Sequence, residues 1–247
     1  KIVGTCAAIL LEGKVDLKCA RSLPGVLRFT REACFGRLGA KVLRELSVYE
    51  KCAGGRVKNS LREGLEWLIS YLPVAPPRRI EARSAAAVVH VFTDGACEPE
   101  AVTAGAVLFE AGHRPEAFGT SVPDAVVDRW RRRGGWQVVS QAELVPVVLS
   151  ARLWAERLRG RYVVWWLDQD AARQGLVKGY SPSEWNAELI DEALLKMAHL
   201  SVFSWYARVP SASNPADMPS RLEWEKLLAF FPDVLRVELR EGHWASL

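Results

Sequence analysis

The sequence predicts an α/β protein in which a mixed five-stranded sheet with helices follows a smaller, mainly helical segment. Apolar runs of strand length recur after residue 85, and helical apolar periodicity separates the later runs. Helical spacing dominates residues 1–72, and prolines with arginines interrupt the pattern near residue 80. The element order that we expect after this boundary is β-β-β-α-β-α-β-α.

The segment 1–80 is expected to form its own mainly helical domain. Apolar residues recur at helical intervals over 35–46 and 60–72. Prolines crowd the stretch 73–77, and proline cannot continue a helix because it lacks the backbone N–H. We therefore read a proline-rich linker there and assign residues 81–247 to a second domain.

The second domain is expected to open with three antiparallel strands joined by turns. The remaining elements alternate helices with strands, as in a sheet that continues with parallel strands. The expected strands are 86–93, 102–110, 116–121, 162–168 and 202–209, and the expected helices begin near 141, span 183–199 and close the chain.

Charge is distributed unevenly along a chain of otherwise ordinary globular composition. The 247 residues carry a net charge of +4, with 49% hydrophobic and 25% charged residues. Residues 1–83 hold 16 lysines and arginines against 8 acidic residues, whereas residues 84–247 hold 17 against 21. This asymmetry is expected if the first part grips phosphates and the second concentrates metal-binding carboxylates. Uneven surface charge without function is the alternative.

Cysteine usage and hydropathy bear on the compartment. The five cysteines show neither a Cys-x-x-Cys pair nor a histidine at zinc-ligand spacing, so zinc and a disulfide framework are not expected. The apolar runs are too short for a bilayer, and no secretion signal precedes them. We expect an intracellular protein, cytoplasmic or nuclear, with no membrane role. A start on Lys1 suggests a processed product or a fragment of a longer reading frame.

Four acidic residues stand where this fold would bring them to one edge of the sheet. Asp94 and Asp168 follow apolar runs, Glu143 opens an amphipathic helix, and Asp217 precedes the last helical segment. Functional groups in open α/β sheets gather at the carboxyl ends of strands. Clustered carboxylates repel one another unless divalent cations neutralise them, and oxygen ligands suit Mg²⁺ or Mn²⁺. The pattern therefore predicts a two-metal nuclease site.

The residues around these acids resemble the four signatures of type 1 ribonuclease H. Residues 208–221 resemble, more narrowly, the ribonuclease H domain of reverse transcriptases from retrotransposons and pararetrovirus-like elements. Residues 13–29 resemble the thumb-to-connection region of such polyproteins more loosely. The four signatures are Phe92-Thr93-Asp94-Gly95-Ala96, Gln141-Ala142-Glu143-Leu144, Trp166-Leu167-Asp168 and Asn214-Pro215-Ala216-Asp217.

This resemblance implies a ribonuclease H-like fold and a metal-dependent endonuclease that hydrolyses the RNA strand of RNA:DNA hybrids. The implied partners are the hybrid and the polymerase domain of the same reverse transcriptase polyprotein. The implied cofactors are two Mg²⁺ or Mn²⁺ ions: Asp94 would bridge both, Glu143 and Asp168 would complete the hydrolytic metal site, and Asp217 would hold the second ion. Many ribonucleases H carry a histidine before the fourth acid, and its absence from residues 210–213 implies a lower turnover.

Each acid also has a structural alternative. Glu143 could close a capping box with Ser140, and Asp170 competes with Asp168 for the strand-end position. Asp217 could cap the last helix, and Asp94 could serve ordinary turn chemistry before a glycine. Pro146 should bend the helix that carries Glu143 unless it lies in the first turn.

Substrate contacts are expected from a basic segment and two amides. Residues 128–136 place arginines and tryptophans before the Glu143 helix, where arginine can neutralise phosphate and tryptophan can stack on a base or sugar. The alternative is a solvated basic loop with its tryptophans in the core. Two amide side chains are expected to contact the nucleic-acid backbone or the 2′-hydroxyl. The expected nucleic-acid-binding residues are Arg129, Arg131, Arg132, Arg133, Trp136, Gln141 and Asn214.

Two other functions stay open at this point. The same fold could act as a DNA nuclease or transposase-like domain, or it could be a catalytically silent domain that binds nucleic acid or serves as a connection. The position of the carboxylates discriminates, because a nuclease needs them in one cleft within reach of two cations.

Overall fold

The structure, a computed structural model, describes residues 1–33, 39–52, 54–75, 77, 87–98, 101–134, 138–245 and 247; the side chains of residues 31–33, 41, 133 and 134 are outside the description. The chain divides into two compact units, Lys1–Ile80 and Glu81–Leu247, and each is described by itself. None of the described helices is both long and apolar enough to cross a membrane.

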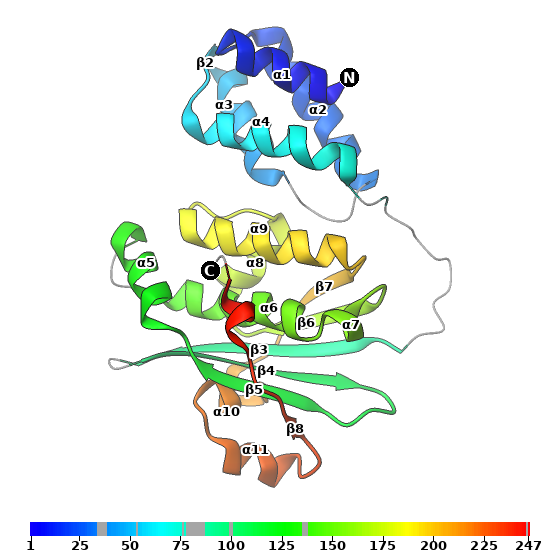
Figure 1. Cartoon of the computed structure of the whole chain (residues 1–247), viewed down its shortest axis with the longest axis vertical. Coiled ribbons are helices and arrows are strands. Elements are labelled where there is room, and N and C mark those ends of the chain that lie inside the picture. The colour runs from blue at the N-terminus through cyan, green and yellow to red at the C-terminus, as the bar shows by residue number, and fades with distance from the viewer. Residues whose placement is uncertain are drawn as a thin grey trace. The chain divides into compact units, whose positions relative to one another are not determined.

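Unit 1 is mainly helical, as the sequence predicts (Figure 1). A short antiparallel ribbon pairs Lys14 with Arg56, and the apolar sides of the helices enclose a core that includes Leu46, Leu61 and Leu65. Its elements are α1 (Ile2–Glu12), β1 (Lys14–Val15), α2 (Leu17–Ala33), α3 (Ala40–Lys51), β2 (Gly55–Arg56), α4 (Asn59–Tyr71) and the 3₁₀ turn η1 (Leu72–Val74). The start of the helix predicted at 35–46 lies outside the described residues, and α4 matches the helix predicted at 60–72.

Unit 2 has the predicted mixed sheet and the predicted order of strands. The elements that were not predicted include α5, α8 and the short edge strand β8. The elements are β3 (Val89–Cys97), β4 (Val102–Glu110), β5 (Glu116–Ser121), α5 (Asp124–Gly134), α6 (Val139–Leu153), α7 (Ala155–Leu158), β6 (Tyr162–Leu167), α8 (Asp170–Lys178), α9 (Glu184–His199), β7 (Phe203–Arg208), η2 (Ser211–Ser213), α10 (Asp217–Ser220), α11 (Trp224–Phe230), β8 (Leu235–Arg236) and η3 (Glu241–Trp244).

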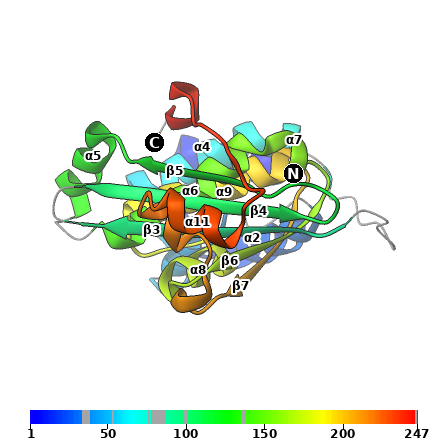
Figure 2. The same cartoon turned by 90° about the horizontal axis from the view of Figure 1, so that it is seen from below.

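The strand order in the sheet is β7-β6-β3-β4-β5-β8. Strands β3, β4 and β5 form an antiparallel meander, whereas β6 and β7 continue from β3 in parallel. Helices α6 and α9 cover one face, and α10 and α11 lie on the other (Figures 1 and 2). This arrangement confirms the predicted fold class, with β8 as a sixth strand beside β5.

Helix α6 is the central helix of unit 2. Every residue from 141 to 151 is buried, because α6 contacts β3 and β4 on one side and α9 on another. A helix that is buried on all sides is expected to carry apolar residues on all sides, so a polar residue in it indicates a specific role. Gln141 and Glu143 are the buried exceptions in its first turns.

Two glycines let α10 rest directly on the sheet. Gly105 in β4 pairs with both Asp94 in β3 and Gly119 in β5, so the three residues form one row across the strands. A Cβ atom at Gly105 would lie 2.3 Å from the backbone nitrogen of Ser220, and one at Gly119 would lie 2.1 Å from the carbonyl oxygen of Pro219. Larger residues in this row would therefore lift α10 away from Asp94.

Replacing Gly105 by alanine should destabilise unit 2 through this contact. We expect the free energy of unfolding to fall by about 3 kcal/mol, because the added methyl meets backbone that cannot rotate away. Gly242→Ala is the matched control, since nothing lies within 4 Å of a Cβ at that position. Urea unfolding of both variants measures the difference, and equal losses would contradict the close approach of α10.

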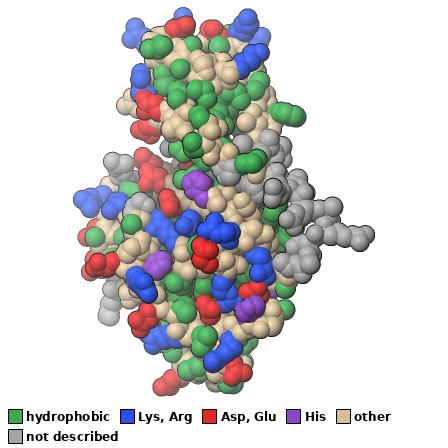
Figure 3. Space-filling model, turned by 45° about the vertical axis from the view of Figure 1, so that its right-hand side comes forward, with side chains coloured by type: hydrophobic (Ala, Val, Ile, Leu, Met, Phe, Trp, Pro, Cys, Tyr) green, Lys and Arg blue, Asp and Glu red, His purple; other side chains and the backbone are tan. Residues whose placement is uncertain are grey.

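An ion-pair network fixes the other end of the same strands. Glu110 at the end of β4 accepts hydrogen bonds from Arg157 at 2.7 Å and from Arg161 at 2.6 Å, and Arg157 also binds Glu116 of β5. Burial raises the pKa of Glu110, but the hydrogen bonds from the two arginines outweigh it and lower the pKa. Figure 3 shows basic and acidic side chains intermixed on this unit, as such pairing requires. The network ties α7 and the start of β6 to the meander.

Candidate metal site

The carboxylates of Asp94, Glu143 and Asp168 come together from three elements. Asp94 lies in β3, Glu143 lies in the second turn of α6, and Asp168 directly follows β6. Asp94 is inside its strand rather than at the end, because β3 stays paired with β4 as far as Cys97. The predicted strand end is wrong by several residues here, while the predicted meeting of strand-borne acids is observed.

Gly95 allows α6 to reach Asp94. A Cβ atom at position 95 would lie 2.2 Å from the carbonyl oxygen of Ala142, so helix and strand are in backbone contact there. That carbonyl cannot receive the usual helical hydrogen bond four residues on, because residue 146 is a proline. The amide of Gly95 donates to the carboxylate of Glu143. Helix α6 nevertheless continues through Pro146, and the Glu143 carboxylate lies with those of Asp94 and Asp168.

The three acids form a compact group with unused ligand atoms. Each offers one oxygen, and these oxygens all lie within 4.8 Å of one another. Asp94 is 4% exposed and Glu143 is 7% exposed. Oε2 of Glu143 and Oδ1 of Asp168 are buried and have no hydrogen-bond partner among the residues that the structure describes. Buried carboxylate oxygens without a donor fit a divalent cation, which prefers hard oxygen ligands.

Electrostatics point in the same direction. Burial, together with the charges of Asp168 and Asp217, raises the pKa of Asp94 to about 6, against the Ser220 hydrogen bond and the charge of Arg221. Burial, Asp94 and Asp168 raise the pKa of Glu143 to about 9, against the Gly95 amide. Without cations Glu143 therefore retains its proton at neutral pH. A bound cation would favour the ionised form of the carboxylates that hold it.

Asp217 is not part of the compact group. Among the described residues, the mutually close acids are Asp94, Glu143 and Asp168. Asp217 begins α10 and pairs with Arg221, whose Nε lies 2.9 Å from Oδ1. Its charge still raises the pKa of Asp94, so it lies at the rim of the same site. The predicted meeting of four acids is thus observed for three, with the fourth engaged by an arginine.

Ser220 is a site residue that the sequence did not single out. Its hydroxyl donates to Oδ2 of Asp94 and also lies 2.9 Å from the carbonyl oxygen of Asp217. The side chain is fully buried. Ser220 and Arg221 follow Asp217 by three and four residues, which places them on its side of a helix, and this spacing was the available signal.

The structural alternatives for the acids are resolved by the helix boundaries. Helix α6 is capped at Val138 without a side-chain hydrogen bond, so Ser140 lies inside the helix and no capping box forms. Asp170 belongs to α8 and pairs with Arg173 at 2.9 Å. The cap of α10 is Ala216 rather than Asp217.

The basic segment before α6 is helical as far as Gly134, where α5 ends. In α5, Arg129 and Arg132 are exposed, Arg131 is half-buried, and Trp130 is 1% exposed and belongs to the core. Burial raises the pKa of the Cys97 thiol, Glu143 raises it further and Arg131 lowers it, so Arg131 and Glu143 both lie near the end of β3. The side chain of Arg133 and all of Trp136 lie outside the described residues.

The two predicted amide contacts are both buried. Asn214 is 4% exposed, its Nδ2 donates to the carbonyl oxygen of Thr93 and its Oδ1 accepts from the amide of Ala216. These bonds hold the turn before α10 on β3 and use both ends of the amide, so Asn214 positions this turn and is not available for the expected contact with a 2′-hydroxyl. Gln141 is also 4% exposed, and its Oε1 has no partner among the described residues.

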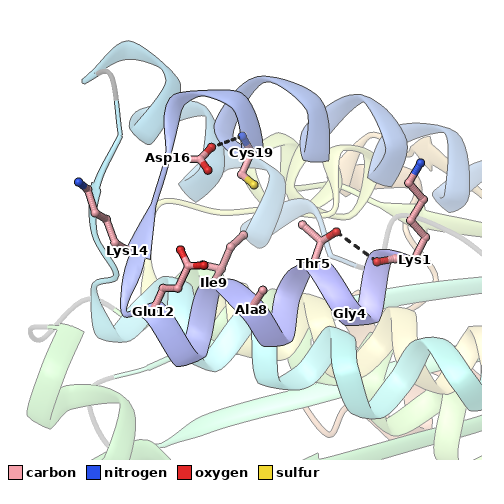
Figure 4. Close-up of a pocket in the computed structure, with 9 residues that line it drawn as sticks. All are labelled: Lys1, Gly4, Thr5, Ala8, Ile9, Glu12, Lys14, Asp16 and Cys19. Carbon is pink, nitrogen blue, oxygen red and sulfur yellow. Dashed lines mark hydrogen bonds between the residues drawn. The ribbon is translucent and has the colours of Figure 1, made fainter.

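Two hollows elsewhere in the described chain lack comparable chemistry. One of about 380 Å³ lies between α1 and α2 of unit 1 (Figure 4). In it Asp16 caps α2 through the amide of Cys19 at 2.6 Å, and Lys1 and Lys14 extend at opposite ends. Another of about 490 Å³ lies beside Phe109 and His90, whose Nδ1 accepts from Trp166. Neither contains the clustered acids.

Comparison with known proteins identifies solved structures only. The sequence matches no protein-family model and no curated protein. A crystal structure of RNase H1 from the halophilic archaeon Halobacterium salinarum is similar at 16% identity and a TM-score of 0.41, covering 56% of this chain and 98% of that chain. The N-terminal RNase H domain of a Mycobacterium tuberculosis protein, solved as a fusion with maltose binding protein, is similar at 13% identity and a TM-score of 0.40, covering 59% and 99%.

Proposed function

We propose that unit 2 is a metal-dependent endonuclease that hydrolyses the RNA strand of RNA:DNA hybrids. The observation that carries the proposal is the buried group of Asp94, Glu143 and Asp168, with carboxylate oxygens that no described donor satisfies. These are three of the four acids in the ribonuclease H-like motifs, and Asp217, the fourth, lies at their rim.

The side chains divide the work of such a site between them. Bound Mg²⁺ or Mn²⁺ would supply an activated water and would neutralise charge at phosphorus. Asp94, Glu143 and Asp168 would hold the ions. Ser220 keeps Asp94 in place through its hydrogen bond, and the Gly95 amide does the same for Glu143. Asp217 would serve the second ion.

Helix α5 is the proposed contact for the nucleic-acid backbone. Arg129 and Arg132 are exposed on it, and Arg131 lies near the carboxylates. Arginine binds phosphate oxygens bidentately and without regard to sequence, as a nuclease for mixed hybrids requires. Gln141 lies two residues before Glu143 in α6, and its Oε1, which has no partner among the described residues, is a proposed acceptor for the 2′-hydroxyl.

The chain context is a separate part of the proposal. The motif around Asp217 and the loose likeness of residues 13–29 support a reverse transcriptase polyprotein, with unit 1 as connection-like segment and a polymerase domain as partner in the same polyprotein. Purification of the natural gene product, followed by a test for a polymerase domain in the same polyprotein, would examine this part independently of the chemistry.

A substrate panel tests the activity. We expect the protein to cut the labelled RNA strand of an RNA:DNA hybrid in Mg²⁺ or Mn²⁺ and to leave duplex DNA and duplex RNA intact. Chelation by EDTA should abolish the reaction. Cutting of duplex DNA would instead indicate a DNA nuclease or transposase-like domain. Hybrid binding without cutting in either metal would indicate a catalytically silent binding domain.

A further inference from the structure

Arg221 pairs with the fourth acid, Asp217. Its Nε lies 2.9 Å from Oδ1 of Asp217, and its Nη1 lies 4.0 Å from Oε1 of Glu98. The side chains of Arg221 and Asp217 are 47% and 40% exposed, so neither is locked by packing. Arg221 therefore occupies the carboxylate of Asp217, the one motif acid that lies outside the three-acid group.

The pair is weak enough to be exchanged. An exposed ion pair contributes about 1 kcal/mol or less, because water screens both charges. Ser220 holds α10 on Asp94 from the buried side, so the backbone that carries both partners is fixed while their side chains face solvent. A cation that took Asp217 would release the guanidinium beside the site without moving α10.

In a nuclease, the phosphate groups of the substrate are the matching ligand for a released guanidinium. The substrate is a polyanion, and the fork of N–H donors on arginine fits two phosphate oxygens. The positive charge of Arg221 already acts on the cluster, since it opposes the raised pKa of Asp94. Cation and phosphate therefore assist each other: the cation binds Asp217, and the phosphate binds the Arg221 side chain that Asp217 releases.

We propose that Arg221 is a phosphate-binding residue of the site, held by Asp217 until a divalent cation takes that carboxylate. This inference rests on the proposed nuclease function and assigns a role in substrate binding to a residue outside the acid motifs. It also gives the pairing of Asp217 with Arg221 a physical reason. The exchange breaks one ion pair and forms a cation–carboxylate contact and an arginine–phosphate contact, with no covalent change.

Arg221→Gln should produce two effects of opposite sign. The affinity for Mn²⁺ without substrate, measured by calorimetry on the full chain, should rise about threefold because the competing cation is gone. The KM for the RNA:DNA hybrid should rise about tenfold with little change in kcat, because a ground-state phosphate contact is lost. Arg221→Lys keeps the charge without the fork and should retain the Mn²⁺ affinity of the unmodified protein, with an intermediate KM.

Arg159→Gln is the matched control. Arg159 pairs with Glu156 at the same distance of 2.9 Å and is 54% exposed, and that pair is not part of the acid group. Urea unfolding shows whether each variant is folded. Unchanged Mn²⁺ affinity or unchanged KM in folded Arg221→Gln overturns the inference while leaving the nuclease proposal standing. If the unmodified protein neither binds Mn²⁺ nor cuts the hybrid, the proposed function itself has failed.

Discussion

Asp94→Asn is expected to lower the rate of hybrid cleavage by a factor on the order of 10³ and to leave hybrid binding within about twofold. Asp94 is the acid that touches every part of the site: it is within reach of Glu143 and Asp168, accepts from Ser220 and feels the charge of Asp217. The asparagine keeps the shape but removes the charge that a cation requires. Single-turnover cleavage and a separate binding titration measure the two quantities.

Asp170→Asn provides the matched control for this experiment. Asp170 is two residues from Asp168, but it starts α8, pairs with Arg173 and is 59% exposed. Its replacement should change cleavage by less than about threefold, because exposed pairs contribute little. Equal losses of activity in the two variants would mean that negative charge anywhere in this region, rather than the buried acid group, supports cleavage.

The elements that follow strong local patterns were predictable from the sequence. The apolar run Tyr162–Leu167 forms a strand with Asp168 directly after it, and β4 and β5 have the predicted bounds, while β3 is shifted by a few residues. The topology then brought Asp94 and Asp168 together, since β3 and β6 are parallel neighbours. The convergence of distant acids was therefore within reach of pattern and topology alone.

Elements with conflicting local signals were missed. The arginine run in α5 suggested a solvated loop, yet Val126, Val127 and Trp130 recur at helical spacing and are buried. Helix α8 is short and contains Gly175, which weakens helical propensity, but Ala172 and Leu176 fix it to the core. Tertiary burial decided both cases over local composition.

The contacts that shape the site could not be predicted because they join distant residues through glycine. Gly95 meets Ala142, and Gly105 meets Ser220, in each case by backbone contact that leaves no sequence pattern of its own. The same contacts set how Glu143 and Ser220 approach Asp94. Sequence could thus name the acids, whereas the structure shows why three of them cluster and why Asp217 stays with Arg221.

The backbone contacts at Gly95 and Gly105 help to bury Asp94 and Glu143 without a neutralising partner among the described residues, and this burial makes the stability of the fold depend on pH. The raised pKa values of Asp94 and Glu143 mean that the folded, metal-free protein binds protons that the unfolded chain releases. The resulting contribution to stability is complete below the unfolded pKa values and is lost as pH rises through about 6 for Asp94 and about 9 for Glu143. Metal-free protein should therefore lose stability from pH 5 to pH 9.

Glu143→Gln is expected to be more stable than the unmodified protein in EDTA and less stable than the unmodified protein in Mn²⁺. At pH 8 without metal, the variant should be more stable than the unmodified protein by about 3 kcal/mol, and the difference should shrink toward pH 5, where Glu143 is protonated with little cost. In Mn²⁺ the unmodified protein gains stability from binding, which the glutamine cannot supply, so the order should invert. Urea unfolding at pH 5, 7 and 8 in both conditions measures this.

Glu156→Gln separates the effect of burial from that of removing any negative charge. Glu156 is 82% exposed on α7 and is outside the acid group, so its replacement should leave both the pH dependence and the Mn²⁺ dependence unchanged. A parallel pH dependence in Glu143→Gln and the unmodified protein would mean that Glu143 is not the group that binds the proton. If Glu143→Gln is the more stable protein in EDTA and the less stable one in Mn²⁺, the same buried carboxylate both binds the metal and destabilises the protein when metal is removed.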